Sequence, residues 1–166
     1  MKTTAFLGIS LALAVAASCG GSSRVDRATG DLGTQIGALR NSTLDHGTHI
    51  AAASSLAAIT PEEEHHHFVS LQREAAMSSD ISTMMAECGG LGTGPDFGDI
   101  RGALDELHRE SDGHLLAMDS VKDMSAAQSE EGRHQSTMTK LLDRMESLRD
   151  GMLDENGHLD CMGGTD

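Results

Sequence analysis

The sequence predicts an all-α fold, an antiparallel up-down-up-down four-helix bundle made of two repeated helical hairpins. Apolar residues recur every three or four positions along four segments, as expected for helices that each bury one stripe. The chain contains three Phe and neither Trp nor Tyr, so Leu, Ile, Val, Ala and Met must fill the core. The chain also matches itself at an offset of 68 residues, which places His46 on His114.

Two copies of the hairpin unit are expected, the first over about residues 36–91 and the second over about 104–159. They align without a gap and in the same apolar phase, which indicates a duplicated unit. Identical residues coincide at several positions: Leu39 and Leu107, His46 and His114, Glu63 and Glu131, His66 and His134, Met77 and Met145. We expect residues 34–162 to form a single domain.

Four helices are expected, over about 34–57, 61–87, 99–126 and 130–153. Thr60 is a natural N-cap, Pro61 suits the first helical position, and Glu63 completes a capping box. The second helix is therefore expected to begin at Pro61. Cys88 and the two glycines after it end that helix, and the Gly/Pro-rich residues 91–98 form the loop between the hairpins.

Residues 1–18 have the organisation of a secretory signal peptide: a charged start, an apolar run and small residues at the end. Cys19 directly follows the small residues "AAS", and this junction resembles the lipobox of bacterial lipoproteins. In that family the cysteine carries a thioether-linked lipid and becomes the first residue of the mature chain. The resemblance implies lipidation of Cys19 and a lipid-anchored place in the bacterial cell envelope, and Gly20 favours the outer membrane. An ordinary signal peptide with an incidental cysteine is the alternative.

The chain beyond the leader divides into a tether and an acidic domain. Residues 19–33 are rich in Gly and Ser and are expected to be a flexible tether. Loss of the leader removes Lys2 and no acid, which changes the formal charge from −14 to −15. Such a surface attracts cations and repels nucleic acid, so no nucleic-acid partner is expected. The lipid is the expected contact with the membrane, because no later run is apolar enough to span it.

Cys88 and Cys161 are the two cysteines that remain besides Cys19. An even pair in an oxidising compartment predicts a disulfide, with thiolate metal ligation as the alternative. The second and fourth helices of an up-down-up-down bundle end at the same end of the molecule. The two cysteines are therefore expected to be neighbours and to clamp the two hairpins together.

The predicted stripes turn one histidine of each helix toward the core: His46, His66, His114 and His134. In the triplet at 65–67, neighbouring residues point about 100° apart, so only one can face the core, and the repeat selects His66. Buried imidazole nitrogens need partners. The hydroxyls of Thr43 and Ser111, or water, would satisfy them. A metal ion would do the same, since neutral imidazole is the commonest metal ligand.

With the first hairpin turn placed near residue 59, His46 and His66 lie at different levels of the bundle, so two layers of ligands are expected. The middle layer would contain His46, His114, Met77 and Met145, and the layer near the turns would contain His66, His134, Glu63 and Glu131. Histidine with methionine suits copper, above all reduced copper, while Zn, Ni and Fe are the alternatives. A methionine stripe is also ordinary core filling.

Glu63 and His66 form a Glu-x-x-His motif, as do Glu131 and His134. A pair of these motifs resembles the ferritin-like di-iron carboxylate proteins, but that family also needs a glutamate on each of the other two helices. None is expected there at the matching level. Haem is not expected either, because the Cys-x-x-Cys-His attachment motif is absent from the sequence.

The sequence therefore predicts a lipid-anchored envelope protein whose bundle binds a transition metal, with copper favoured, for sensing, buffering or resistance. No nucleophile elbow or phosphate-binding loop points to an enzyme. The alternative is a structural or interaction lipoprotein that contacts an envelope protein partner and holds no cofactor. A di-iron or haem redox protein is the third hypothesis.

Overall fold

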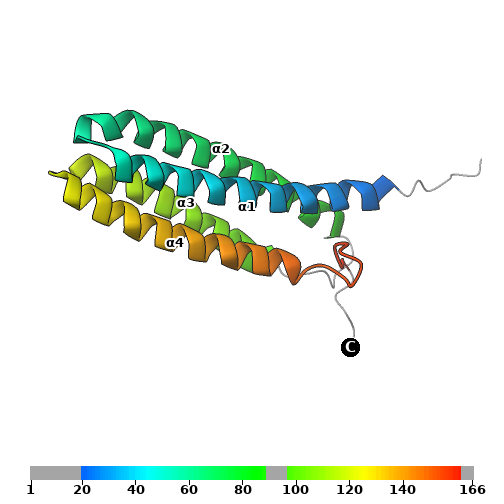
Figure 1. The fold of residues 1–166 in the computed structure, drawn as a ribbon. Coiled ribbons are helices and arrows are strands. Elements are labelled where there is room, and N and C mark those ends of the chain that lie inside the picture. The colour runs from blue at the N-terminus through cyan, green and yellow to red at the C-terminus, as the bar shows by residue number, and fades with distance from the viewer. Residues whose placement is uncertain (1–19, 89–96, 162–166) are drawn as a thin grey trace, which may run out of the picture.

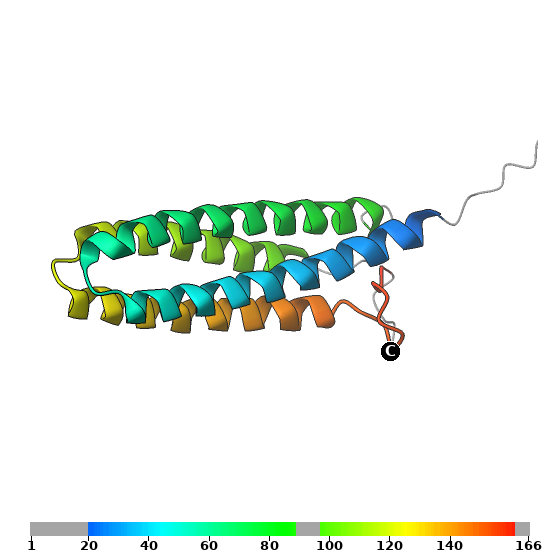
Figure 2. The same cartoon turned by 45° about the horizontal axis from the view of Figure 1, so that its top comes forward.

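In the computed structural model, which describes residues 20–88 and 97–161, four long helices lie side by side (Figures 1 and 2). They are α1 (Gly20–Ala52), α2 (Leu56–Cys88), α3 (Phe97–Ser120) and α4 (Met124–Asp150). α1 and α3 each pack against both α2 and α4. The predicted all-α four-helix bundle is confirmed for these residues. None of the described helices combines the length and the apolar character that crossing a membrane requires.

The two hairpin turns are short and lie earlier in the chain than expected. Residues 53–55 join α1 to α2, and residues 121–123 join α3 to α4, again 68 residues later. The expectation that α2 begins at Pro61 is wrong, because α2 begins at Leu56 and Pro61 lies inside it. Ile59, which is 4% exposed, packs in an apolar cluster next to the turns. Burial of this side chain outweighs the local capping signal.

The start of α4 is set by Asp123. Its backbone is extended, and its side chain accepts a hydrogen bond from the Ala126 N–H at 2.9 Å, the usual arrangement of an N-cap residue. α4 therefore begins at Met124, ahead of the expected start near residue 130. α3 correspondingly ends at Ser120, short of the expected residue 126.

Residues 20–33, expected to form a flexible tether, instead form the first part of α1. Their apolar side chains Val25, Ala28 and Leu32 are buried in the core. The spacing of three and four residues continues through this Gly-rich stretch, and burial outweighs the low helix propensity of glycine. The signal segment 1–18 and the lipidation site at Cys19 lie outside the described residues.

Two apolar clusters fill the interior, one on each side of a polar layer. The larger one includes Met77 and Met145, both fully buried. The smaller one lies next to the hairpin turns and contains Ile50, Ile59, Met118 and Ala127. Between the two clusters, four histidines and two glutamates are buried in the interior, nearer the hairpin turns than the opposite end of the bundle. The polar layer therefore interrupts an otherwise apolar core.

A disulfide lies at the end of the bundle opposite the hairpin turns. It joins Cys88, the last residue of α2, to Cys161, which follows α4. The chain after α4 folds back through a bridge between Leu153 and Leu159 and a turn at Gly157, whose φ of 79° suits glycine. The predicted disulfide is therefore present, and it links the first hairpin to the second.

Candidate metal centre

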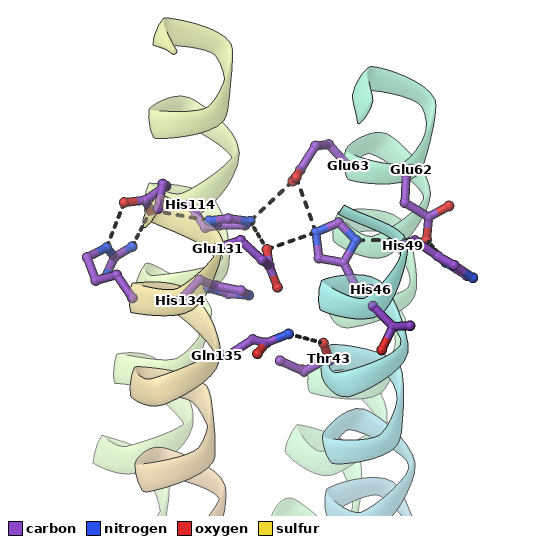
Figure 3. A network of polar contacts seen from close by, with 12 residues as sticks. Thr43, His46, His49, Glu62, Glu63, His114, Glu131, His134 and Gln135 are labelled. Carbon is purple, nitrogen blue, oxygen red and sulfur yellow. Dashed lines mark hydrogen bonds and ion pairs between the residues drawn. The ribbon is translucent and has the colours of Figure 1, made fainter. Parts of the chain in front are cut away.

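Six polar side chains from all four helices meet in the polar layer, and all of them except His66 are labelled in Figure 3. They are His46 of α1, Glu63 and His66 of α2, His114 of α3, and Glu131 and His134 of α4. Each is at most 4% exposed. The Glu-x-x-His spacing places both residues of a motif on the same face of their helix. All six are among the residues that the sequence predicts as ligands.

The position of the turns decides which of these residues lie level with one another. Because α1 ends at Ala52 and α2 begins at Leu56, Glu63 lies beside His46. The expected pairing of the α1 and α3 histidines with Met77 and Met145 is not formed, because both methionines lie in the larger apolar cluster. The carboxylates of Glu63 and Glu131 lie beside His46, where the thioethers of Met77 and Met145 are expected from the sequence.

The two glutamates lie between His46 and His114, and we call these four residues the inner group. Nε2 of His46 lies 3.2 Å from Oε1 of Glu63 and 3.3 Å from Oε2 of Glu131. Nε2 of His114 lies 3.2 Å from Oε2 of Glu63 and 3.3 Å from Oε2 of Glu131. Taking one donor atom from each residue, the four atoms all lie within 4.8 Å of one another.

These short contacts are not aligned as hydrogen bonds. Nε2 of both histidines and both oxygens of Glu131 are buried and have no hydrogen-bond partner. A tetrahedral metal ion with bonds of about 2.0–2.1 Å holds neighbouring donor atoms about 3.3 Å apart. The observed contacts of 3.2–3.3 Å match that separation. The inner group can therefore hold a metal ion.

The hydroxyls of Thr43 and Ser111, which could satisfy the buried imidazoles without a metal ion, have other hydrogen-bond partners. Thr43 Oγ1 donates to the Leu39 carbonyl at 3.0 Å, and Ser111 Oγ donates to Oε1 of Glu74 at 2.7 Å. Oε2 of Glu74 lies 2.7 Å from Nδ1 of His108, so this buried carboxylate has a partner on each oxygen. Neither hydroxyl therefore satisfies an imidazole of the inner group.

Two further glutamates, Glu110 and Glu130, hold the histidines of the second hairpin, and we call them the outer glutamates. Nδ1 of His134 lies 2.9 Å from Oε1 of Glu110, and Nδ1 of His114 lies 3.2 Å from Oε1 of Glu130. Arg133 donates to both carboxylates. Metal-binding histidines commonly give their second ring N–H to a carboxylate, which leaves the other nitrogen free for the ion. The second hairpin has this arrangement twice.

The first hairpin lacks most of this outer support. Nδ1 of His46 lies 3.8 Å from Oε1 of Glu62, and neither nitrogen of His66 has a hydrogen-bond partner. At the position that corresponds to Glu110, the first copy of the repeat has Ser42. The two hairpins are therefore alike in the residues that face the centre and unlike in the residues behind them.

Without an ion, the inner group balances its own charge. Burial by itself lowers the pKa values of His46 and His114, but contacts with the two inner glutamates outweigh it and raise them to about 9 and about 10. Burial by itself raises the pKa of Glu63, but the two histidines lower it to about 2, and they also lower the pKa of Glu131. At neutral pH two imidazolium rings therefore face two carboxylates.

His66 and His134 have the opposite electrostatic character. Burial lowers the pKa of His66 to about 3, and the charges of His46 and His134 act in the same direction. Burial also lowers the pKa of His134 to about 4, together with the charge of His114. Both rings are therefore neutral at physiological pH, and the neutral ring is the form of imidazole that binds metals.

Gly47 allows α4 to approach α1 closely beside the inner group. A Cβ atom at this position would lie 2.9 Å from Oε1 of Glu131 and would collide with the side-chain amide of Gln135. That amide donates to the Thr43 carbonyl at 3.4 Å (Figure 3). A larger residue at position 47 would therefore displace the Gln135 amide and press on Oε1 of Glu131.

A cleft of about 310 Å³ between α2 and α3 reaches the inner group from the side. Glu63 contributes to its lining, and so do two exposed acids, Glu64 and Asp119. Negative charge around a cleft raises the local concentration of cations. The cleft thus brings negative charge to the side of the inner group, with Glu63 common to both.

The remaining histidines of the triplet lie outside the centre. His65 is exposed, and His67 is half-buried with Nε2 at 3.6 Å from Oδ1 of Asp112. Among the three, His66 is the one that is buried among the other central histidines, as the repeat predicts.

Comparison of the chain with protein-family models, with curated proteins and with solved structures finds no match.

Proposed function

We propose that this protein is a metal-binding protein of the bacterial cell envelope that holds a divalent transition-metal ion in the inner group. One observation carries the proposal. Four buried donor atoms, one from each helix, lie within 4.8 Å of one another and lack hydrogen-bond partners. A bound ion would satisfy all four atoms at once, and it would replace the two protons that balance the carboxylates in the metal-free fold.

The rival explanation is a structural protein in which the inner group is only a buried set of ion pairs. Such sets seldom stabilise a fold more than apolar packing does, because desolvation offsets the attraction. Buried polar atoms without hydrogen bonds each cost about 1–3 kcal/mol. The outer glutamates favour the metal site, because they orient two rings in the way that ligands are usually oriented.

The donor set favours a divalent ion over reduced copper. Thioether ligands would favour reduced copper, but Met77 and Met145 lie in the larger apolar cluster. Two imidazoles with two carboxylates suit Zn²⁺, Fe²⁺ and Cu²⁺. Among these ions, Zn²⁺ has the strongest preference for the tetrahedral arrangement that donor atoms about 3.3 Å apart would form.

We also propose that Cys19 carries a lipid that anchors the protein to the outer membrane. The Cys88–Cys161 disulfide supports an oxidising compartment. Because α1 begins at Gly20, a lipid on the preceding residue would hold the bundle close to the bilayer. His46 would then lie roughly 40 Å away along α1, at 1.5 Å per residue. A buried ligand set at this distance suits buffering or sensing of the ion, or resistance to it.

The test is metal binding by the chain from Gly20 onward, purified without a histidine tag and stripped of metal. Zn²⁺, Cu²⁺, Ni²⁺ and Fe²⁺ are titrated separately, and the heat of binding and the melting temperature are recorded. Tight binding should raise the melting temperature, because an ion at 100 times its dissociation constant adds about 2.7 kcal/mol to the free energy of unfolding.

Two variants show whether the ion occupies the inner group. Glu63→Gln with Glu131→Gln keeps the size of both side chains and removes both inner charges, so it should abolish tight binding while circular dichroism stays helical. His65→Gln changes an exposed histidine of the same helix and should bind like the parent protein. If none of the four ions binds the parent protein, the proposal fails and the structural protein replaces it.

A further inference from the structure

His66 and His134 form a second pair of rings directly beside the first pair, which is His46 and His114. The ring of His66 stacks on that of His46 with centroids 4.1 Å apart, and the ring of His134 stacks on that of His114 at 3.8 Å. Within each pair the rings are nearly perpendicular, at 5.9 Å and 85° in the first pair and 5.7 Å and 82° in the second. The second pair therefore repeats the geometry of the first, displaced by about 4 Å.

The nitrogens of the second pair lack partners. Both ring nitrogens of His66 and Nε2 of His134 are buried without a hydrogen bond, in residues that are 4% and 0% exposed. The contact of Nδ1 with Glu110 makes this nitrogen the N–H donor, so the free lone pair of His134 is on Nε2. The hydroxyl of Ser70, one helical turn beyond His66, is also buried without a partner. These atoms have the position and the chemistry of ligands.

Glu131 can connect the two pairs. Its Oε2 faces the two histidines of the inner group, while its Oε1 is buried and unpartnered. Figure 3 shows this second oxygen pointing toward the level of His134. Two metal ions that share ligands lie about 3.5–4 Å apart in proteins. The stacking distances of 4.1 Å and 3.8 Å place the second pair of rings directly beside the first, at a comparable spacing.

We propose that His66 and His134 hold a second divalent transition-metal ion beside the first, with Glu131 bridging the two ions. The inference rests on the proposed function, because it adds an ion to the same centre. Water or the Ser70 hydroxyl would fill the remaining coordination positions.

The test is the number of ions per chain. The metal-free protein is loaded with Co²⁺, passed over a desalting column and analysed for metal content and by native mass spectrometry. The parent protein should hold two ions, and His66→Asn with His134→Asn should hold one, a twofold loss. Electron paramagnetic resonance should show magnetic coupling between the two Co²⁺ ions in the parent protein and none in the variant. His65→Asn with His158→Asn, which changes two exposed histidines, should keep both ions and their coupling.

The outcomes separate this inference from the proposed function. One ion in the parent protein, lost in His46→Asn with His114→Asn but kept in the second-pair variant, overturns the second site alone. Two ions that both remain in the second-pair variant overturn it as well. No bound ion overturns both proposals. If the second-pair variant does not fold, Glu110→Gln replaces it, and this change should weaken the second binding step by about 10–100-fold without affecting the first.

Discussion

Metal binding by the inner group should weaken steeply as the pH falls. In the metal-free fold the pKa values of His46 and His114 are about 9 and about 10, so both rings are protonated at neutral pH. A metal ion binds only the neutral ring, and each ion bound there must therefore displace two protons. Glu63, with a pKa of about 2, is already ionised and releases none.

The magnitude follows from this proton count. Two protons displaced per ion change the apparent binding constant by about 100-fold per pH unit, as long as the pH stays below about 9. That factor corresponds to about 2.7 kcal/mol per pH unit. Lowering the pH favours the protonated rings, so binding at about pH 6.5 should be about 100-fold weaker than at about pH 7.5.

Calorimetric titration with Zn²⁺ in two buffers of different ionisation enthalpy gives the number of protons released. Competition against a chelator at the two pH values gives the ratio of affinities. His46→Asn should lower the release from two protons to one, and a second ion, bound by two neutral rings, should add almost none. Equal binding constants at the two pH values would refute the reasoning, because the ion would then be bound by groups that carry no proton.

The remaining predictions concern stability and the shape of the site. The metal-free protein should be most stable near pH 6.5, the ordinary pKa of histidine. Above that pH, His46 and His114 keep their protons in the fold but lose them in the unfolded chain, so the free energy of unfolding falls as the pH rises. Below that pH, His66 and His134 stay neutral in the fold but are protonated in the unfolded chain, so the free energy of unfolding falls as the pH falls. Urea unfolding should therefore give a smaller free energy of unfolding at about pH 5 and at about pH 8.5, and a steady rise across this range would contradict the assignment. Met77→Leu should change the free energy of unfolding by less than about 1.5 kcal/mol and leave Zn²⁺ affinity unaltered, whereas a loss of affinity would place the thioether at the site. Cys88→Ser with Cys161→Ser should lower the free energy of unfolding by about 2–5 kcal/mol, and the folded variant should still bind Zn²⁺ in calorimetry. Gly47→Ala should weaken Zn²⁺ binding by about tenfold or more through displacement of Glu131, and an unchanged affinity would show that the carboxylate has room to move.

The sequence predicts which residues face the core but not which of them lie level with one another. The helical period fixes the buried face of each helix, so the inward direction of His46 could be predicted. The level of a residue along the bundle axis depends on where the turn between two helices lies. The capping signal at Thr60 and Pro61 is local, whereas packing of Ile59 with Met118 across the smaller apolar cluster starts α2 earlier. A turn displaced by about five residues moves the residue opposite a given position by about ten. As a result, the carboxylate of Glu63 lies level with His46, and the thioether of Met77 does not.

The outer glutamates could not be assigned from the sequence of one helix. Glu110 precedes His114 by four residues, and Glu130 precedes His134 by four, so local spacing would pair each glutamate with the histidine of its own helix. The structure crosses the pairs, because Glu110 contacts His134 and Glu130 contacts His114. Such contacts depend on how α3 and α4 are rotated relative to each other, which a single sequence does not specify.

The disulfide also gives the two hairpins a covalent connection that does not run through residues 89–96. Each hairpin supplies half of the donor atoms, so the centre exists only while both are held together. A protease that cut between residues 89 and 96 would leave the halves tethered by Cys88 and Cys161. Their separation, and with it the loss of the centre, would then require a reductant in addition to hydrolysis.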